Sequence, residues 1–469
     1  MDRLEQQVEM WISDHKEELL ADIQKLVRHR SISEKRPKEP VYGQGCKDVL
    51  EEMLSLGKRY GFQVENADDV CGVISYEGGE RSIGLWGHLD VVPEGGQWVY
   101  PPYECTQVGD FLIGRGVQDN KGPCIAALYV LRCLKELQIP FSHTLIQIVG
   151  CAEETGMEDV VRYTAQFPVP DYNIITDCGF PVCYGEKGIL EARLRSDKAF
   201  SSRIVDFYGG SVSNIVPDHA SLTLYGCQVL PEAFKDLPEW ITIEQKEDLL
   251  VLSAKGISAH AAFPDGGINA VSRLCNAVKK TQLLVGEDLK ILSFLQELSG
   301  NTDGSALGIA CQDEESGALT SVCGVVRLDD GHLEIEMNIR YPITADSEKL
   351  QENIIKQCKA RGFQPARLDV NRPNYQDKNS VFVRTLNDSY NEITGQDKPP
   401  FVMGGGTYAR KLPNAVAFGP GLPTDLSPLG LPQGHGGCHS PDEAQSIPNL
   451  LLALKIYVLS LIRLDKALS

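Results

Sequence analysis

The run G-L-W-G-H-L-D-V-V-P, from Gly84 to Pro93, is apolar until it reaches two polar residues, His88 and Asp90. In an extended strand, residues two positions apart point to the same side. A metal-bound histidine usually donates its second ring N–H to a carboxylate or a carbonyl, and Asp90 is well placed to accept it from His88. The same pair also fits a solvated strand end, so a metal site requires further ligands elsewhere in the chain.

Short apolar strands alternate with a helical segment around this run. Strands are predicted at residues 73–76, 83–86 and 145–149, and a helix at residues 123–137. This alternation predicts an α/β domain with a central, mostly parallel sheet flanked by helices. In such folds functional groups gather at the carboxyl ends of strands, which is where His88 and Asp90 lie. A packing helix is also predicted at residues 16–27, with Asp14 and Glu17 as its capping box.

Acidic residues follow further strands and turns. Asp119 lies in the glycine-rich turn G-R-G-V-Q-D-N-K-G (residues 114–122), Glu153 and Glu154 follow the strand at residues 145–149, and Asp177 follows a strand at residues 173–176. Asp119 is suited either to bridging two metal ions through its two oxygens or to capping the next helix. Adjacent carboxylates repel, so Glu153 and Glu154 favour a cation or a shared proton, although acids also complement the start of a helix.

The segment H-G-G-C-H-S-P-D-E near the C terminus supplies two further candidates, His435 and His439. The collected residues offer nitrogen and oxygen ligands without a thiolate. Such a donor set suits zinc, with manganese or cobalt as alternatives. A second glycine-rich run, G-G-G-T-Y-A-R at residues 404–410, lacks the Lys-Ser/Thr ending of a phosphate-binding P-loop, so nucleotide binding is not expected.

The composition favours a globular protein that acts on small molecules or peptides. A formal net charge of −19 disfavours binding to nucleic acid and to anionic membranes. The 14 cysteines include no C-x-x-C pair, which fits the reduced thiols of a cytoplasmic protein. The first ten residues carry charges where a signal peptide is apolar, and Lys455 and Arg463 interrupt the apolar tail at residues 450–464, so we expect neither export nor a membrane span.

The motifs resemble those of the co-catalytic zinc metallopeptidases, the family of aminoacylases, glutamate carboxypeptidases and carnosinases. Within that family the chain is most similar to the PepV-type bacterial dipeptidases. Five motifs in the same order carry the resemblance over nearly the whole chain: G-H-L-D-V-V-P at Gly87, G-R-G-V-Q-D-N-K-G at Gly114, E-E-T-G at Glu153, F-P-V-C-Y-G-E-K-G at Phe180 and H-S-P-D-E at His439.

Carried over residue by residue, the resemblance implies two zinc ions per chain. His88 and Asp177 would hold one ion, Glu154 and His439 the other, and Asp119 would bridge them. The resemblance also implies that Asp90 orients His88 and that Glu153 is the general base. His435 has no counterpart, because only His439 keeps the H-x-x-x-E spacing to Glu443. The alanine at position 152 departs from the family, in which an acid often precedes the two glutamates.

The resemblance further implies a discontinuous catalytic domain, residues 1–185 and 385–469, with an inserted α+β lid at residues 186–384. Within the lid, strands are predicted at residues 189–194, 220–225 and 249–254, helices at 269–280 and 348–361, and a hairpin that pairs residues 322–328 with 333–339. The Asp330-Gly331 dipeptide is typical of the turn of such a hairpin.

Five positions in or near the lid match substrate-binding motifs of the family. The resemblance implies that His260 donates a hydrogen bond to the oxyanion, and that Arg340 and Asn214 bind the carboxylate of the peptide. Gly405 and Arg410 match its substrate-binding loop. Without the resemblance, Asn214, His260 and Arg340 fit better as a turn cap, a helix-start histidine and a strand end.

The implied reaction is hydrolysis of a dipeptide with a free N terminus by a water between two zinc ions, with Glu153 as the base. An N-acyl amino acid deacylase or desuccinylase would use the same metals and stays an alternative. A non-catalytic peptide-binding protein is a second alternative, against which the retention of Glu153 argues. Because the extended lid is thought to replace a partner subunit in this branch of the family, a monomer is expected.

Overall fold

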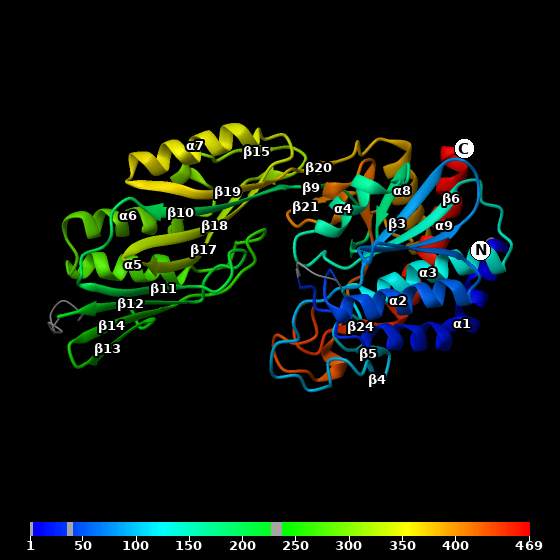
Figure 1. Ribbon diagram of the computed structural model, residues 1–469, viewed down its shortest axis with the longest axis horizontal. Coiled ribbons are helices and arrows are strands. Elements are labelled where there is room, and N and C mark those ends of the chain that lie inside the picture. The colour runs from blue at the N-terminus through cyan, green and yellow to red at the C-terminus, as the bar shows by residue number, and fades with distance from the viewer. Residues whose placement is uncertain (1–2, 35–40, 227–236) are drawn as a thin grey trace. The chain divides into compact units, whose positions relative to one another are not determined.

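The computed structural model describes residues 3–34, 41–226 and 237–469. The chain divides into two compact units (Figure 1). The first unit comprises Met1–Gly185, Asn374–Phe401 and Gly406–Ser469, and the second comprises Glu186–Pro373 and Val402–Gly405. The return to the first unit therefore lies at Asn374 rather than at the predicted residue 385, because the whole of helix α8 (Val381–Thr394) packs against helix α9 (Ile447–Leu468) of the first unit.

The first unit is built on a large mixed sheet with the strand order β1-β2-β6-β3-β7-β22-β9-β20. Its strands are β1 (Gln63–Ala67), β2 (Cys71–Tyr76), β3 (Ser82–His88), β6 (Thr144–Gly150), β7 (Tyr172–Ile175), β9 (Val182–Glu186), β20 (Asn374–Tyr375) and β22 (Ala415–Phe418). The four central strands β6, β3, β7 and β22 are parallel, whereas β1, β2 and β9 pair in antiparallel fashion. The predicted α/β class is confirmed, with the parallel part at its centre.

Shorter strands complete this unit. They are β4 (Thr106–Val108), β5 (Phe111–Ile113) and β24 (Ala444–Ser446) in a small sheet, β8 (Cys178–Gly179) paired with β23 (Pro420–Gly421), and β21 (Phe401–Met403), at which the chain passes between the units. The pairing of β24 with β5 matters for the site, because it holds the H-S-P-D-E segment beside the turn that carries Asp119.

Helices α2 (Gln44–Arg59) and α3 (Lys121–Glu136) pack against the strands, and α1 (Arg3–Val27) packs on both of them (Figure 1). The remaining helical segments are α4 (Glu158–Gln166), η2 (Tyr408–Lys411) and η3 (Ser427–Leu429). The predicted start of α1 was wrong: the helix already begins at Arg3, so Asp14 and Glu17 lie in its interior. Its buried stripe continues upstream through Val8, Trp11 and Ile12, and that packing extends the helix beyond the local capping signal.

Helix α9 is long and apolar enough, by length and composition, to cross a membrane. However, 67% of its most apolar window is buried inside the protein, where α9 packs against α1, α3 and α8. The two cations that interrupt it form ion pairs within the first unit: Lys455 with Glu5 at 2.6 Å, and Arg463 with Glu392 at 2.8 Å. Burial of this kind is typical of a core helix.

The second unit is an eight-stranded antiparallel sheet with the order β13-β14-β12-β11-β17-β18-β10-β19. Its elements are β10 (Gly188–Ser196), β11 (Ile204–Gly209), β12 (His219–Tyr225), β13 (Ile241–Lys246), β14 (Leu249–Lys255), β17 (Thr320–Asp329), β18 (His332–Tyr341), β19 (Phe363–Asn371), α5 (Ala270–Thr281), α6 (Gly286–Gly300), α7 (Ser347–Ala360), η1 (Ser305–Leu307) and the short pair β15 (Gln312–Asp313) and β16 (Gly317–Ala318). The predicted hairpin is confirmed as β17 and β18, in which Asp329 pairs with His332.

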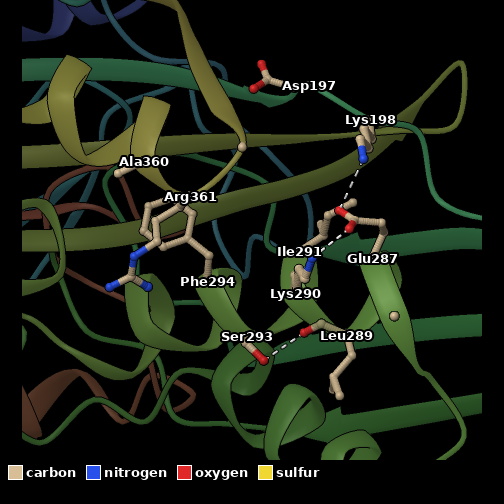
Figure 2. A pocket seen from close by; sticks show the side chains of 12 residues that line it. Asp197, Lys198, Glu287, Leu289, Lys290, Ile291, Ser293, Phe294, Ala360 and Arg361 are labelled. Atoms are coloured by element: carbon tan, nitrogen blue, oxygen red, sulfur yellow. Dashed lines mark hydrogen bonds and ion pairs between the residues drawn. The ribbon is translucent and has the colours of Figure 1, made fainter.

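The three helices of the second unit share one apolar core with the sheet. The opposite face of the sheet is polar, because β10 and β18 alternate core residues with polar ones such as Glu191 and Glu336. On the helical side, a surface cavity of about 780 Å³ lies beside α6. The buried side chains of Phe294 and Ile291 are part of its lining (Figure 2). Lys290 and Lys198 at this cavity pair with Glu287, at 2.7 and 3.6 Å. No predicted site residue lines this cavity.

Candidate metal centre

Parallel strands of the first unit end together and bring the predicted ligands to one edge of the sheet. In the register of these strands, His88 at the end of β3 lies beside Gly150 at the end of β6, and Trp86 lies beside Ile175 at the end of β7. Glu153 and Glu154 follow β6, Asp177 follows β7, and Asp119 precedes α3. The convergence follows from the rule that carboxyl ends of parallel strands share an edge.

Two groups of donor atoms form at this edge, and Asp119 belongs to both. Nε2 of His88 lies 3.0 Å from Oδ1 of Asp119 and 3.5 Å from Oδ2 of Asp177. Nε2 of His439 lies 3.1 Å from Oδ2 of Asp119 and 3.0 Å from Oε1 of Glu154. The two oxygens of one carboxylate thus face two different imidazole rings, which is the arrangement that a bridging ligand requires.

Grouping the possible metal-binding atoms only by their mutual distances gives two sets that overlap with these groups. His88, Glu153 and Asp177 offer atoms within 4.8 Å of one another, and so do His88, Asp119 and Glu154. The first set contains Glu153, which the sequence predicted as a base. A base that reaches a metal-held water must lie a few ångströms from the ligands, so this proximity fits either role.

Asp90 supports the site in two ways. Nδ1 of His88 lies 3.0 Å from the Asp90 carbonyl oxygen and 3.4 Å from its carboxylate Oδ1, so the carbonyl is the nearer partner. The carboxylate of Asp90 also accepts the backbone N–H groups of Glu153 at 3.2 Å and Glu154 at 3.1 Å. Asp90 is fully buried. The same residue therefore contacts the ring of His88 and the turn that carries both glutamates.

Sequence reasoning missed three supporting residues. Oε1 of the buried Glu443 accepts the backbone N–H groups of Gly116, Gln118 and Asp119, at 3.1, 2.9 and 3.0 Å, and its Oε2 pairs with the buried Arg115 at 2.7 Å. Asn120 donates to Oδ1 of Asp177 at 3.0 Å and to the carbonyl of Thr176 at 2.8 Å. All three lie in the G-R-G-V-Q-D-N-K-G and H-S-P-D-E motifs, and this position was the only feature of the sequence that could have indicated a supporting role.

Two positions that the sequence left unassigned have structural partners. Nδ1 of His435 lies 2.5 Å from Oδ2 of Asp442, and Oδ1 of the same carboxylate accepts the N–H groups of Val99 and Tyr100. His435 therefore stands outside the two ligand groups. The alanine at position 152 is supported from helix α4. Its N–H donates to Asp159 at 2.7 Å, and Tyr408 donates to the same carboxylate oxygen at 2.5 Å.

The second unit brings its own predicted residues together. The carbonyl of Asn214 accepts the N–H of Ala261 at 2.8 Å, and His260 pairs with Ile215 in an antiparallel bridge. Arg340 donates from Nη1 to the carbonyl of Gly404 at 3.1 Å. Gly404 lies so close to Ala262 that a Cβ on it would come within 2.8 Å of the Ala262 side chain.

The run at residues 404–410 is divided between the units. Gly405 belongs to the second unit, whereas Gly406 and Arg410 belong to the first. The guanidinium of Arg410 packs directly on Gly406, where a Cβ would lie 1.9 Å from Nη2. Gly406 is therefore required for this placement of Arg410.

Comparison with known proteins identifies the family. A profile described as "Peptidase family M20/M25/M40" matches residues 84–463, a range that holds every residue of the two donor groups. The chain belongs to this family. It is 32% identical over 467 residues to the Bacillus subtilis "Putative dipeptidase YtjP", covering 96% of this chain and 98% of that protein. It is 28% identical over 430 residues to the Staphylococcus aureus "Putative dipeptidase SAB1611c", covering 87% and 92%.

Solved structures share the fold at low identity. Human carnosine dipeptidase 1 matches with a TM-score of 0.58 and 15% identity over 99% of both chains. The aminoacylhistidine dipeptidase of Vibrio alginolyticus matches with a TM-score of 0.57 and 14% identity, over 94% of this chain and 96% of that one. The chain is a peptidase of the M20/M25/M40 family, as the motifs predicted.

The donor atoms of this M20/M25/M40 peptidase fit metal ions. Two imidazoles and several carboxylates, without a thiolate, form a set that suits zinc, manganese or cobalt. Five carboxylates lie in or beside the two groups, namely those of Asp90, Asp119, Glu153, Glu154 and Asp177. Two histidines cannot offset so much negative charge, so a cation stabilises the arrangement.

The protonation of the metal-free site follows from the same contacts. Burial lowers the pKa of His88, but hydrogen bonds from its ring to the carboxylates of Asp119, Asp177 and Asp90 outweigh this effect and raise the pKa well above its usual value. Hydrogen bonds from its ring to the carboxylates of Asp119 and Glu154 raise the pKa of His439 to about 10. Both rings are therefore charged at neutral pH when no metal is bound.

Metal binding at pH 7 is expected to release a net number of protons from the site, among them protons of the His88 and His439 rings. A metal binds neutral imidazole, so each of the two protonated histidine rings must lose a proton when the metal binds. Affinity should accordingly rise with pH up to the pKa of His439, about 10. Calorimetric titration of the metal-free protein with zinc, in buffers of different ionisation enthalpy, measures this number. In His439→Ala the release should fall by about one proton, and an unchanged value would contradict the assignment.

Proposed function

We propose that this peptidase is a dipeptidase that holds two zinc ions and hydrolyses dipeptides with a free N terminus. The observation that carries the proposal is the position of Asp119, whose two oxygens face His88 and His439. Asp177 would complete the first metal site and Glu154 the second. The name of the Bacillus subtilis relative, at 32% identity over nearly the whole chain, supports a dipeptide as the substrate.

The exposure of the two sites suggests different roles. His88 is 1% exposed, whereas the side chain of His439 is 54% exposed. Catalytic metal sites keep a position open for water or substrate, so the site at His439 is the proposed point of access. Bound metal ions would activate a water and polarise the scissile carbonyl.

Glu153 is proposed as the general base because it stands apart from the other acids of the site. Within the described residues, its carboxylate makes no hydrogen bond or ion pair, whereas Glu154 contacts His439 and Asp177 contacts both Asn120 and His88. Burial raises its pKa well above the usual value, and the charges of Asp177 and Glu154 add to this effect, while His88 opposes it. A carboxylate with a raised pKa is suited to accept a proton from water and pass it to the leaving amine.

The second unit would contribute substrate contacts. The proposal assigns the oxyanion hydrogen bond to His260, and the carboxylate of the dipeptide to Arg340 and Asn214, since the fork of an arginine matches a carboxylate. Gly405 and Arg410 are proposed as further substrate contacts. A monomer in the cytoplasm completes the proposal, and the 13 cysteines of the described residues, all free thiols, are compatible with that compartment.

Metal-stripped protein is expected to cleave Ala-Ala and β-Ala-His only after zinc or manganese is restored. A tripeptide and N-acetyl-alanine should be cleaved slowly or not at all. The measurement is initial rate against each substrate, by detection of the released amine. Cleavage of N-acetyl-alanine alone would instead indicate a deacylase. Binding of dipeptide without turnover, with metal bound, would indicate a peptide-binding protein.

A further inference from the structure

We propose that Asn338 is a positioning residue that fixes the guanidinium of Arg340 for recognition of a substrate carboxylate, and that Glu191 fixes Asn338 in turn. This inference rests on the proposed function for the role of Arg340. It is carried by hydrogen bonds within the second unit alone, on the polar face of its sheet.

Arg340 makes hydrogen bonds through two different nitrogens of its guanidinium. Its Nε donates to Oδ1 of Asn338 at 2.7 Å, and its Nη1 donates to the carbonyl of Gly404 at 3.1 Å. Arg340 and Asn338 lie two positions apart on β18, on the same face, and are only 6% and 1% exposed. Bonds from two different nitrogens restrict the rotation of the guanidinium plane. The orientation of Arg340 is thus set before any substrate binds.

Asn338 connects a cation to an anion. Its Nδ2 donates to Oε1 of Glu191 at 3.3 Å, and the two residues are direct partners across β18 and β10. Arginine only donates and a carboxylate only accepts, so the residue between them must accept on one side and donate on the other. An amide does this. The contacts also determine which atom of the Asn338 amide is oxygen and which is nitrogen.

The same network reaches the segment that carries Asn214. Oγ of Ser213 lies 3.5 Å from Oε1 of Glu191, at the limit of a hydrogen bond. The Ser213 backbone lies directly on Gly324 of β17, where a Cβ would come within 2.1 Å of the Ser213 carbonyl oxygen. Gly324 therefore allows this segment to lie against the sheet beside Glu191. The network that orients Arg340 therefore also contacts the residue next to Asn214.

The expected consequence of Asn338→Ala is a loss of selectivity for a free carboxylate. Loss of a hydrogen bond to a buried charged group corresponds to about a 10- to 100-fold change. We expect kcat/KM for Ala-Ala to fall by this factor, mainly through KM, while the value for Ala-Ala amide changes by less than about threefold. Glu336→Gln is the matched control, since Glu336 lies on the same face of β18 and pairs with Arg193 at 2.6 Å. It should leave both substrates unchanged.

A double variant in which Asn338 and Glu191 exchange amide and carboxylate distinguishes a positioning role of Asn338 from a general loss of structure. Asn338→Asp places a second carboxylate beside Glu191 and should impair selectivity as strongly as Asn338→Ala. Adding Glu191→Gln supplies an amide that donates to the introduced carboxylate, which still accepts from Nε of Arg340. The double variant should recover most of the wild-type ratio of kcat/KM between Ala-Ala and its amide. Failure of this rescue would overturn the positioning role.

An NMR measurement that needs no catalytic activity tests the positioning of Arg340 independently of the proposed function. A hydrogen-bonded Nε–H of arginine exchanges slowly and gives a resolved ¹H–¹⁵N signal, which Arg340→Lys would identify by its loss. The Arg340 signal should persist in Glu336→Gln, disappear or move in Asn338→Ala, and return in the double variant. If wild-type protein cleaves no dipeptide, the proposed function is wrong and this signal still decides the inference. An Arg340 signal unchanged in Asn338→Ala would overturn it.

Discussion

Glu153→Gln is expected to lower kcat/KM for Ala-Ala by a factor of about 10²–10⁴, the range that general acid–base catalysis contributes. Glutamine keeps the shape of the side chain but cannot take a proton from water. The loss should appear in kcat, because the proton moves only during the reaction and the substrate contacts are unchanged. The metal content should stay at the wild-type level, since the Glu153 carboxylate is not an assigned ligand.

The measurement combines steady-state kinetics with metal analysis of the purified variants. Glu158→Gln, at the first turn of α4, is the matched control and should retain full activity. Glu154→Gln should behave differently from Glu153→Gln, because it removes the partner of His439 at 3.0 Å and should therefore lose metal as well as activity. If Glu153→Gln loses metal and Glu154→Gln does not, the two glutamates have exchanged roles.

The convergence of the candidate ligands was predictable because their positions follow from local patterns. His88, Glu153, Glu154 and Asp177 come directly after apolar runs, and consecutive parallel strands deliver such residues to one edge of the sheet. The sequence pattern does not predict which oxygen of Asp119 faces the ring of His88 and which faces the ring of His439. That Asp119 directs one oxygen to each histidine depends on the conformation of its turn, which no sequence signal predicts.

The supporting residues were less predictable for a related reason. Glu443 and the backbone of Asp119 are more than 300 residues apart in sequence, and only the pairing of β24 with β5 brings them together. The start of α1 was missed because a capping signal is local, whereas the helix is stabilised by tertiary contacts of Trp11 and Ile12. The strands and helices were predicted correctly where the periodicity was strong. The start of α1 and the partners of Asp119 depend on contacts between distant segments.

Asp119→Asn is expected to disrupt both metal sites at once. One oxygen of Asp119 lies 3.0 Å from the ring of His88 and the other lies 3.1 Å from the ring of His439. An amide offers only one oxygen and no charge, so one site loses a ligand outright and the other loses a charged ligand. Bound zinc should fall from two ions to one or fewer per chain. Activity should fall by more than about 100-fold, the upper range for residues that only support a ligand.

Glu443→Gln is the informative comparison, because Glu443 holds the Asp119 turn without being a ligand. It should lower metal affinity by only about 10- to 100-fold, so that excess zinc restores activity. Asp110→Asn, at an exposed acid near the same turn, should change neither quantity. Metal analysis after dialysis and zinc titration of activity distinguish the three variants. Asp119→Asn with two tightly bound ions would contradict a bridging role, since a residue that bridges two metals cannot be replaced without affecting both.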